Sequence, residues 1–109
     1  MIEKHGQHLI VDIYQAENIN DINVIKNAIH EMIHELNATL LSENYHYFEP
    51  HGVTGVACLA ESHISCHTWP EDNYAAFDVF VCGEVSPEVT LNIFKKYFSG
   101  QLKSQLIKR

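Results

Sequence analysis

Apolar and polar positions alternate along several short segments of the chain, a pattern typical of β-strands with one buried face. In the first such segment, Leu9, Val11 and Ile13 fall on one side of an extended chain. Residues 53–59 form a more continuous apolar run, which indicates a buried strand. The pattern predicts strands at residues 8–14, 39–42, 45–48, 53–59, 63–67, 75–81 and 102–107.

Apolar residues spaced three or four apart predict two helices. Residues 21–36 carry such a stripe, and the polar pair at 20–21 can cap its start. For the second helix, Ser86 is the expected cap, Pro87 occupies the first turn and Gly100 ends it. The expected buried face of this second helix consists of Val89, Ile93 and Tyr97.

The order of these elements, with strands joined by short links, predicts an antiparallel sheet. We expect an α+β fold, a two-layer sandwich in which both helices cover one face of the sheet. Residues 1–109 fit a single domain. A domain this small leaves much of its surface exposed, so we expect a homodimer in which the second subunit covers the free sheet face.

Charge and composition argue against a nucleic-acid-binding, membrane-spanning or secreted protein. The net charge of -7, from 14 acidic and 7 basic residues, argues against a nucleic-acid binder, which needs a basic face. No segment approaches the length of a membrane span, and the opening MIEKHGQHLIVDIY lacks the features of a secretion signal. The three cysteines form no CxxC pair. We expect a cytoplasmic protein with free thiols, of which Cys58 and Cys66 are buried.

Residues 61–83, ESHISCHTWPEDNYAAFDVFVCG, hold an unusual density of reactive side chains. A serine hydroxyl needs a base to act as a nucleophile, and His67 or the thiol of Cys82 can move a proton for Ser62. The segment contains no GxSxG motif, so an ordinary serine hydrolase is not expected. The residues by themselves leave structural or solvated roles open for these side chains.

Two other patterns offer metal ligands, and neither predicts a metal site. Residues 30–34 read HEMIH and match HExxH, but the helical stripe places both histidines on its solvated flank. The set His63, Cys66, His67 and Cys82 lacks the regular pairs of structural zinc sites. We therefore expect no metal.

On these motifs the chain resembles the prokaryotic S-adenosylmethionine decarboxylases. ESHISCHTWPE followed by YAAFDVFVCG resembles the processing and catalytic segment of that family, and FEPHGVTGVACLAES and GQHLIVDIY resemble its upstream parts. The similarity covers roughly residues 5–98. It implies an enzyme that removes carbon dioxide from S-adenosylmethionine and so supplies the aminopropyl donor for spermidine synthesis.

The resemblance implies that the chain cuts itself between Glu61 and Ser62, giving a β chain of residues 1–61 and an α chain of residues 62–109. The Ser62 hydroxyl would attack the Glu61 carbonyl and form an ester. Elimination and hydrolysis would then leave a pyruvoyl group at position 62, the one cofactor expected. Its carbonyl can form a Schiff base with the substrate amine and hold the electrons released when carbon dioxide leaves.

The resemblance also assigns roles to single residues. His67 is implied as the acid–base residue of self-processing, and Cys82 as the donor that returns a proton to the substrate carbon. Thr54 stands where the family commonly has a serine whose hydroxyl assists processing. Phe48 matches an aromatic that stacks on adenine, and Glu71 an acid that binds the ribose hydroxyls. Simple packing of Phe48 and a solvated position for Glu71 are the alternatives.

The chain departs from the family near the expected pocket. Asp72 and Asn73 stand where the family often has Tyr-Gly, and Val81 stands where it often has Thr. These changes leave open a pyruvoyl-dependent decarboxylase of another amino acid, such as ornithine or arginine. An uncleaved binding or regulatory subunit is the alternative outside catalysis.

Overall fold

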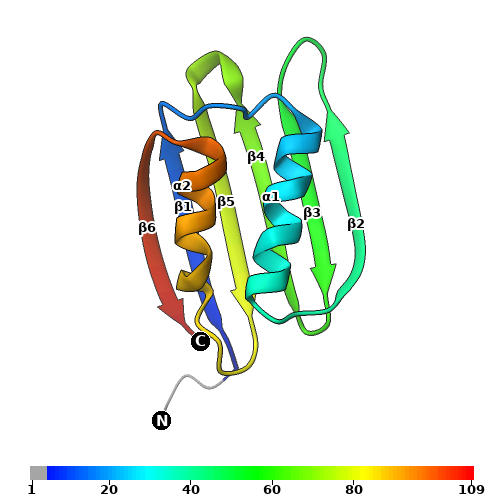
Figure 1. The fold of residues 1–109 in the computed structure, drawn as a ribbon, viewed down its shortest axis with the longest axis vertical. Helices are drawn as coiled ribbons and strands as arrows, with labels where there is room; N and C mark the ends of the chain where they lie inside the picture. Colours follow the sequence, from blue (N-terminus) through cyan, green and yellow to red (C-terminus); the bar gives the residue numbers. More distant parts are fainter. Residues whose placement is uncertain (1–4) are drawn as a thin grey trace.

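The computed structural model describes residues 5–109, which form one antiparallel six-stranded sheet with both α-helices on the same side (Figure 1). The order across the sheet is β2-β3-β4-β5-β1-β6. The predicted α+β sandwich is thereby confirmed. The strands are β1 (Gln7–Tyr14), β2 (Leu40–Tyr47), β3 (Val53–Leu59), β4 (Ser62–Trp69), β5 (Tyr74–Val81) and β6 (Gln101–Lys108).

The first helix, α1 (Ile22–Glu35), begins where the sequence predicts. The carboxylate of Asp21 accepts hydrogen bonds from the backbone N–H of Asn23 at 2.9 Å and of Val24 at 3.3 Å, so Asp21 is the cap. Each fully buried side chain of its apolar stripe contributes about 1.5–3 kcal/mol. The buried residues are Ile25, Ala28, Ile29, Met32 and Ile33.

The second predicted helix is shorter than expected. Its first residues form a 3₁₀ turn, η2 (Pro87–Thr90), and α2 (Leu91–Phe98) follows. Ser86 caps the turn by accepting a hydrogen bond from the Glu88 N–H at 3.1 Å. The prediction for Val89 is wrong: a 3₁₀ turn completes a revolution in three residues instead of 3.6, and Val89 is exposed. Neither helix of the described residues is long and apolar enough to cross a membrane.

Edge strand β2 corrects a second prediction. Residues 39–48 were expected to form two short strands, yet Glu43 and Asn44 stay paired with Ala57 and Val56 of β3 in one continuous strand. A shift in the pairing register between Leu40 and Ser42 is the irregularity that remains. Polar side chains are compatible with this position because an edge strand borders solvent.

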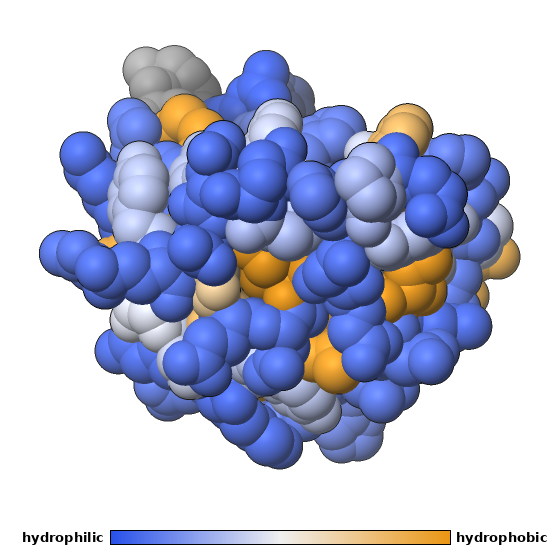
Figure 2. Space-filling view, turned by 90° about the horizontal axis from the view of Figure 1, so that it is seen from above, coloured by the Kyte–Doolittle hydropathy of each residue, from blue (hydrophilic) through white to orange (hydrophobic). Residues whose placement is uncertain are grey.

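The two faces of the sheet differ in what covers them. Alternate residues of the central strands point toward the helices and form the core, among them Leu9, Val11 and Ile13. The residues between them point to the opposite face, which no helix of residues 5–109 covers (Figure 1). Seen from above, most of the surface is hydrophilic and apolar side chains emerge in small separate patches (Figure 2). We call the uncovered side the open face.

Candidate active site

Ser62 is the first residue of β4 and directly follows the turn at residues 60–61 that joins β3 to β4. In this turn Glu61 has a φ of 62°. That left-handed region favours Gly and Asn, and another residue held in it costs roughly 1–2 kcal/mol. The peptide bond between Glu61 and Ser62 therefore begins at a strained residue.

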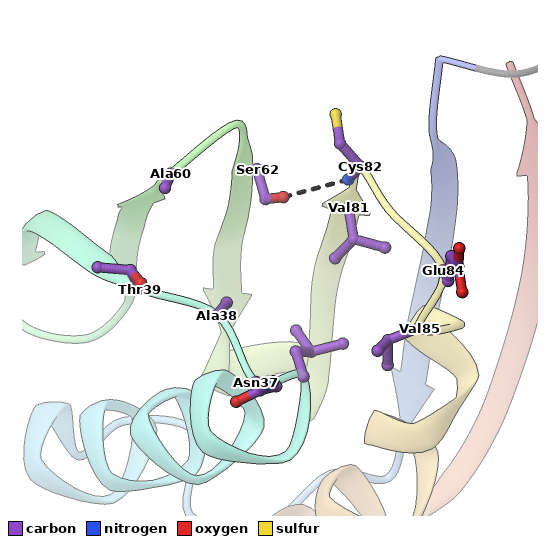
Figure 3. Close-up of a pocket in the computed structure, with 10 residues that line it drawn as sticks. Asn37, Ala38, Thr39, Ala60, Ser62, Val81, Cys82, Glu84 and Val85 are labelled. Carbon is purple, nitrogen blue, oxygen red and sulfur yellow. Dashed lines mark hydrogen bonds between the residues drawn. The ribbon is translucent and has the colours of Figure 1, made fainter.

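The side chain of Ser62 lies in a pocket of about 250 Å³ at the end of the sheet, beside the C-terminal end of α1 (Figure 3). The backbone N–H of Cys82 donates a hydrogen bond of 3.2 Å to the Ser62 hydroxyl oxygen. A fixed N–H donor stabilises negative charge that develops on that oxygen. The pocket thus suits a serine that loses its proton. Its polar lining includes Asn37, Thr39 and Glu84, which the sequence did not indicate.

Cys82 follows β5 directly and is half-buried in the same pocket. Its backbone contacts Ser62, whereas its Sγ atom points away from the Ser62 hydroxyl (Figure 3). This thiol is therefore not aimed at the serine oxygen. Ser62 and Cys82 are therefore neighbours in one pocket, but their side chains point in different directions.

Thr54 and His67 are directly paired in the register of β3 and β4. The Thr54 Oγ1 atom lies 3.0 Å from Nδ1 of His67, a hydrogen bond. Both side chains project from the open face. This bond fixes the orientation of the imidazole and leaves its Nε2 atom for a second partner.

A second pocket, of about 220 Å³, contains the Thr54–His67 pair together with Phe48 and Glu71. Glu71 Oε1 lies 3.9 Å from Nε2 of His51, an ion pair when the imidazole is charged. His51 is a lining residue to which the motifs assigned no role, although it lies within the segment FEPHGVTGVACLAES. All four residues that the family resemblance places around the substrate and the processing base therefore share one pocket.

The two groups of predicted residues lie apart within one chain. Ser62 and His67 are the first and sixth residues of β4, and five residues of strand span about 17 Å. An odd separation also turns their side chains to opposite faces of the sheet. Ser62 lies on the same side of β4 as the buried residues Ile64 and Cys66, whereas His67 is exposed on the open face. A single chain does not bring His67 to the Ser62 hydroxyl.

Of the two cysteines predicted to be buried, one is buried and the other is exposed. Cys66 points into the core, and burial raises the pKa of its thiol to about 12. Cys58 is exposed, so the prediction that it is buried was wrong. The reason is the alternation along β3, which the continuous apolar run concealed: Ala57 and Leu59 face the helices and Cys58 faces outward. Cys66 therefore cannot join the neighbouring histidines at a metal.

The two histidines of the HEMIH segment are solvated, as predicted. His30 and His34 are both exposed on α1. The Nε2 atom of His30 lies 2.7 Å from Oε1 of Glu43 on β2, so its ring pairs with a carboxylate of the adjacent strand.

Asn73, one of the departures from the family pattern, retains the backbone conformation of its turn. It ends the short 3₁₀ turn η1 (Pro70–Asp72) with a φ of 51°, and its N–H donates to the Pro70 carbonyl at 3.1 Å. Asn tolerates the left-handed region better than other side-chain-bearing residues do. Asn at this position is therefore compatible with the left-handed turn that ends the loop carrying Glu71.

The family model, the relatives and the solved structure that match this chain all belong to one family. A family model described as S-adenosylmethionine decarboxylase matches residues 7–109. An S-adenosylmethionine decarboxylase proenzyme of Acidithiobacillus ferrooxidans is 38% identical over 108 residues, which cover 95% of this chain and 81% of the relative. The proenzyme of Methanococcus maripaludis is 45% identical over 99 residues, with 88% and 81% covered.

A solved structure agrees with these relatives. The crystal structure of the adenosylmethionine decarboxylase from Aquifex aeolicus superposes with a TM-score of 0.87 at 32% sequence identity. The match covers 98% of this chain and 92% of that one. The sheet, the two helices and the connections between them are thus shared over nearly the whole length.

Proposed function

Because the chain belongs to the S-adenosylmethionine decarboxylase family, we propose that its activity arises by self-cleavage between Glu61 and Ser62. The chain is an enzyme that removes carbon dioxide from S-adenosylmethionine. Its product is the aminopropyl donor for spermidine synthesis. The matches do not support the alternative of an ornithine or arginine decarboxylase. One observation carries the cleavage proposal: the Ser62 hydroxyl follows the strained Glu61 and accepts a backbone hydrogen bond.

The cleavage step uses atoms of the turn itself. The Ser62 oxygen adds to the Glu61 carbonyl carbon, the peptide C–N bond breaks, and the freed amine takes up a proton while an ester remains. Loss of the Cα proton of residue 62 then breaks the bond between Cβ and the ester oxygen. Glu61 leaves as a carboxylate that keeps the serine oxygen. The dehydroalanine that remains takes up a proton at Cβ and becomes an imine, whose hydrolysis consumes one water and releases ammonia.

Two features favour this reaction at Ser62. The left-handed conformation of Glu61 raises the energy of the uncleaved turn, and scission releases that strain. The Cys82 N–H stabilises the serine oxygen as it gains negative charge. The products are residues 1–61 and residues 62–109, the second beginning with a pyruvoyl group.

The pyruvoyl group would supply a carbonyl that accepts the electrons released when carbon dioxide leaves. Ser62 is its precursor, and the surrounding pocket of about 250 Å³ has room for a small ketone. The Cys82 thiol, directed away from the Ser62 oxygen, is suited to return a proton to the substrate carbon. In the second pocket, the exposed ring of Phe48 can stack on adenine and Glu71 can accept hydrogen bonds from ribose hydroxyls.

We propose that a homodimer joins the two pockets. Ser62 and Cys82 of one subunit would meet Thr54 and His67 of the other, because about 17 Å of strand separates the two sets within a chain. The open face, which carries Thr54 and His67, also exposes large apolar side chains that offer a contact surface for a second subunit. These are Tyr14, Val56, Trp69 and Ile107.

A reducing compartment suits this enzyme. Cys58, Cys66 and Cys82 are all unpaired thiols in the structure, and proteins that keep free thiols are typical of the cytosol. We propose a cytoplasmic location.

The test of the activity is release of labelled carbon dioxide from carboxyl-labelled substrates. We expect release from S-adenosylmethionine and none above background from ornithine or arginine. The matched control is Ser62→Ala, which keeps the fold and removes the nucleophile. Release from ornithine or arginine alone would assign the scaffold to the other substrate class. A chain that stays intact and releases nothing from any substrate would favour a non-catalytic subunit.

A further inference from the structure

Two imidazoles and one carboxylate converge on the open face across three neighbouring strands, outside both pockets. His8 on β1 and His63 on β4 each direct Nε2 at the same oxygen, Oδ2 of Asp78 on β5, at 2.7 Å and 3.1 Å. These three strands are neighbours in the sheet, with β5 in the middle. Strand pairing therefore builds the cluster from residues that are far apart in the sequence.

The side chains of the cluster are held in place by a second layer of contacts. The Ser65 hydroxyl donates a hydrogen bond to the other oxygen of Asp78, Oδ1. The Phe80 ring lies edge-on to His8 at 5.6 Å and is stacked on His63 at 5.9 Å between ring centroids. Metal sites in proteins commonly have this outer layer, which orients the ligands.

The donor set suits a metal ion, and the hydrogen-bond separations of 2.7 Å and 3.1 Å would widen when an ion replaces the N–H protons. The three ligand atoms all lie within 4.8 Å of one another, and a zinc ion bonds imidazole nitrogen and carboxylate oxygen at about 2.0–2.2 Å. Two imidazoles with one carboxylate suit Zn²⁺, Co²⁺ or Fe²⁺, whereas Mg²⁺ prefers oxygen ligands. The His8 and Asp78 side chains are partly buried, and that of His63 is 41% exposed. In the single chain, solvent can therefore complete the coordination; in the proposed homodimer, the second subunit lies against this face.

We propose that His8, His63 and Asp78 form a binding site for one divalent transition-metal ion of the Zn²⁺ class. The sequence does not predict it, because positions 8, 63 and 78 form no motif and only the β4–β5–β1 pairing gathers them. The ion would link three adjacent strands across the open face and so stabilise the middle of the sheet. The inference stands on this geometry and is independent of the decarboxylase activity.

The experiment titrates the purified, chelator-treated full chain with Co²⁺ and Zn²⁺. The visible absorption of Co²⁺ reports its coordination, and mass spectrometry of dialysed protein reports the bound Zn²⁺. We expect one ion per chain, unaffected by excess Mg²⁺, and a rise in melting temperature on binding. His8→Ala should abolish binding, and Ser65→Ala should weaken it about 10- to 100-fold. Asp78→Asn, nearly the same shape, tests the carboxylate if His8→Ala does not fold.

Matched controls separate this site from other donors. His30→Ala removes an imidazole that bonds to a single carboxylate, Glu43, and should leave binding unchanged. Cys58→Ser removes the exposed thiol and should also have no effect. Absence of saturable binding would overturn the proposal. Loss of binding in His30→Ala or Cys58→Ser, with retention in His8→Ala or Asp78→Asn, would overturn it equally.

Discussion

The Thr54 hydroxyl oxygen lies 3.0 Å from Nδ1 of His67 across the β3–β4 pair. Two functions follow from this bond: it fixes the ring orientation, and it determines which nitrogen remains for proton transfer. Thr54 also carries a methyl group that the family's serine lacks. The branched side chain restricts the hydroxyl to fewer rotamers.

Changes at Thr54 should therefore alter the rate of self-cleavage. Thr54→Val keeps the shape and removes the hydroxyl, so we expect scission about fivefold slower, the effect of losing one hydrogen bond worth roughly 1 kcal/mol. Thr54→Ser should cleave at least as fast as the wild type. A time course of fragment appearance on a denaturing gel measures both. Equal rates for wild type and Thr54→Val would exclude a role for the hydroxyl.

Self-cleavage should be recoverable by mixing two inactive chains. Ser62→Ala lacks the nucleophile and His67→Ala lacks the base, and each is expected to stay intact alone. Refolded together at equal concentration, mixed dimers would contain one complete site, and about half of the His67→Ala chains should be cleaved by random pairing. Mass spectrometry of the mixture counts them.

The control for this mixture pairs Ser62→Ala with a chain that carries both substitutions, in which no site is complete. Scission in the first mixture and none in the control is the expected result. If His67 acted on Ser62 of its own chain, neither mixture would cleave. That result would contradict a site shared between subunits.

Cys82→Ala should separate processing from turnover. The Cys82 backbone N–H, which this substitution retains, makes the contact to Ser62, so scission should proceed normally. Loss of a general acid typically lowers a rate about 10²- to 10⁴-fold, and we expect carbon dioxide release to fall by that order. Parallel measurement of scission and turnover provides the check. Unchanged turnover would remove the thiol from the reaction.

A contact between the two helices should give acid-sensitive stability. Glu31 accepts hydrogen bonds from Lys96 at 2.9 Å and Tyr97 at 2.8 Å. The hydrogen bond from Lys96, then that from Tyr97, lowers the pKa of Glu31 below its ordinary value of 4.5. A carboxyl with a lower pKa in the folded state stabilises the protein above the unfolded pKa. The stabilisation is lost as pH falls through the folded pKa.

Urea unfolding of Glu31→Gln at a series of pH values tests this contact. The wild type should be the more stable of the two near neutral pH, and the difference should shrink as the pH drops below the ordinary pKa range of glutamate. Glu35→Gln, at an exposed position of the same helix, is the control and should follow the wild-type curve. A constant difference across the whole series would mean that Glu31 charge is not involved.

The sequence predicts the fold well because each element carries its own pattern. The stripe of α1 and the alternation of β1 both derive from one buried face. Errors arose where the pattern is weak. The polar residues Glu43 and Asn44 hid the continuity of β2, an edge strand, and Pro87 starts a 3₁₀ turn whose period differs from the helical one.

The sequence names candidate site residues but not their arrangement. The resemblance points to Ser62, His67 and Cys82 individually, and their roles stay predictions. Their separation depends on strand parity and pairing, since residues five apart on one strand face opposite sides. The sequence also does not reveal the cluster of His8, His63 and Asp78, because these residues come together only when three strands pair.

Accurate masses of the purified fragments test the central claim, which is conversion of Ser62 into a pyruvoyl group. Scission by this route consumes one water and releases one ammonia. The account predicts two fragments, residues 1–61 and 62–109, whose summed mass exceeds that of the intact chain by the difference between water and ammonia. A sum larger by a whole water would mean simple hydrolysis with a serine retained at position 62. That result, or an active protein with only the full-length mass, would contradict the account.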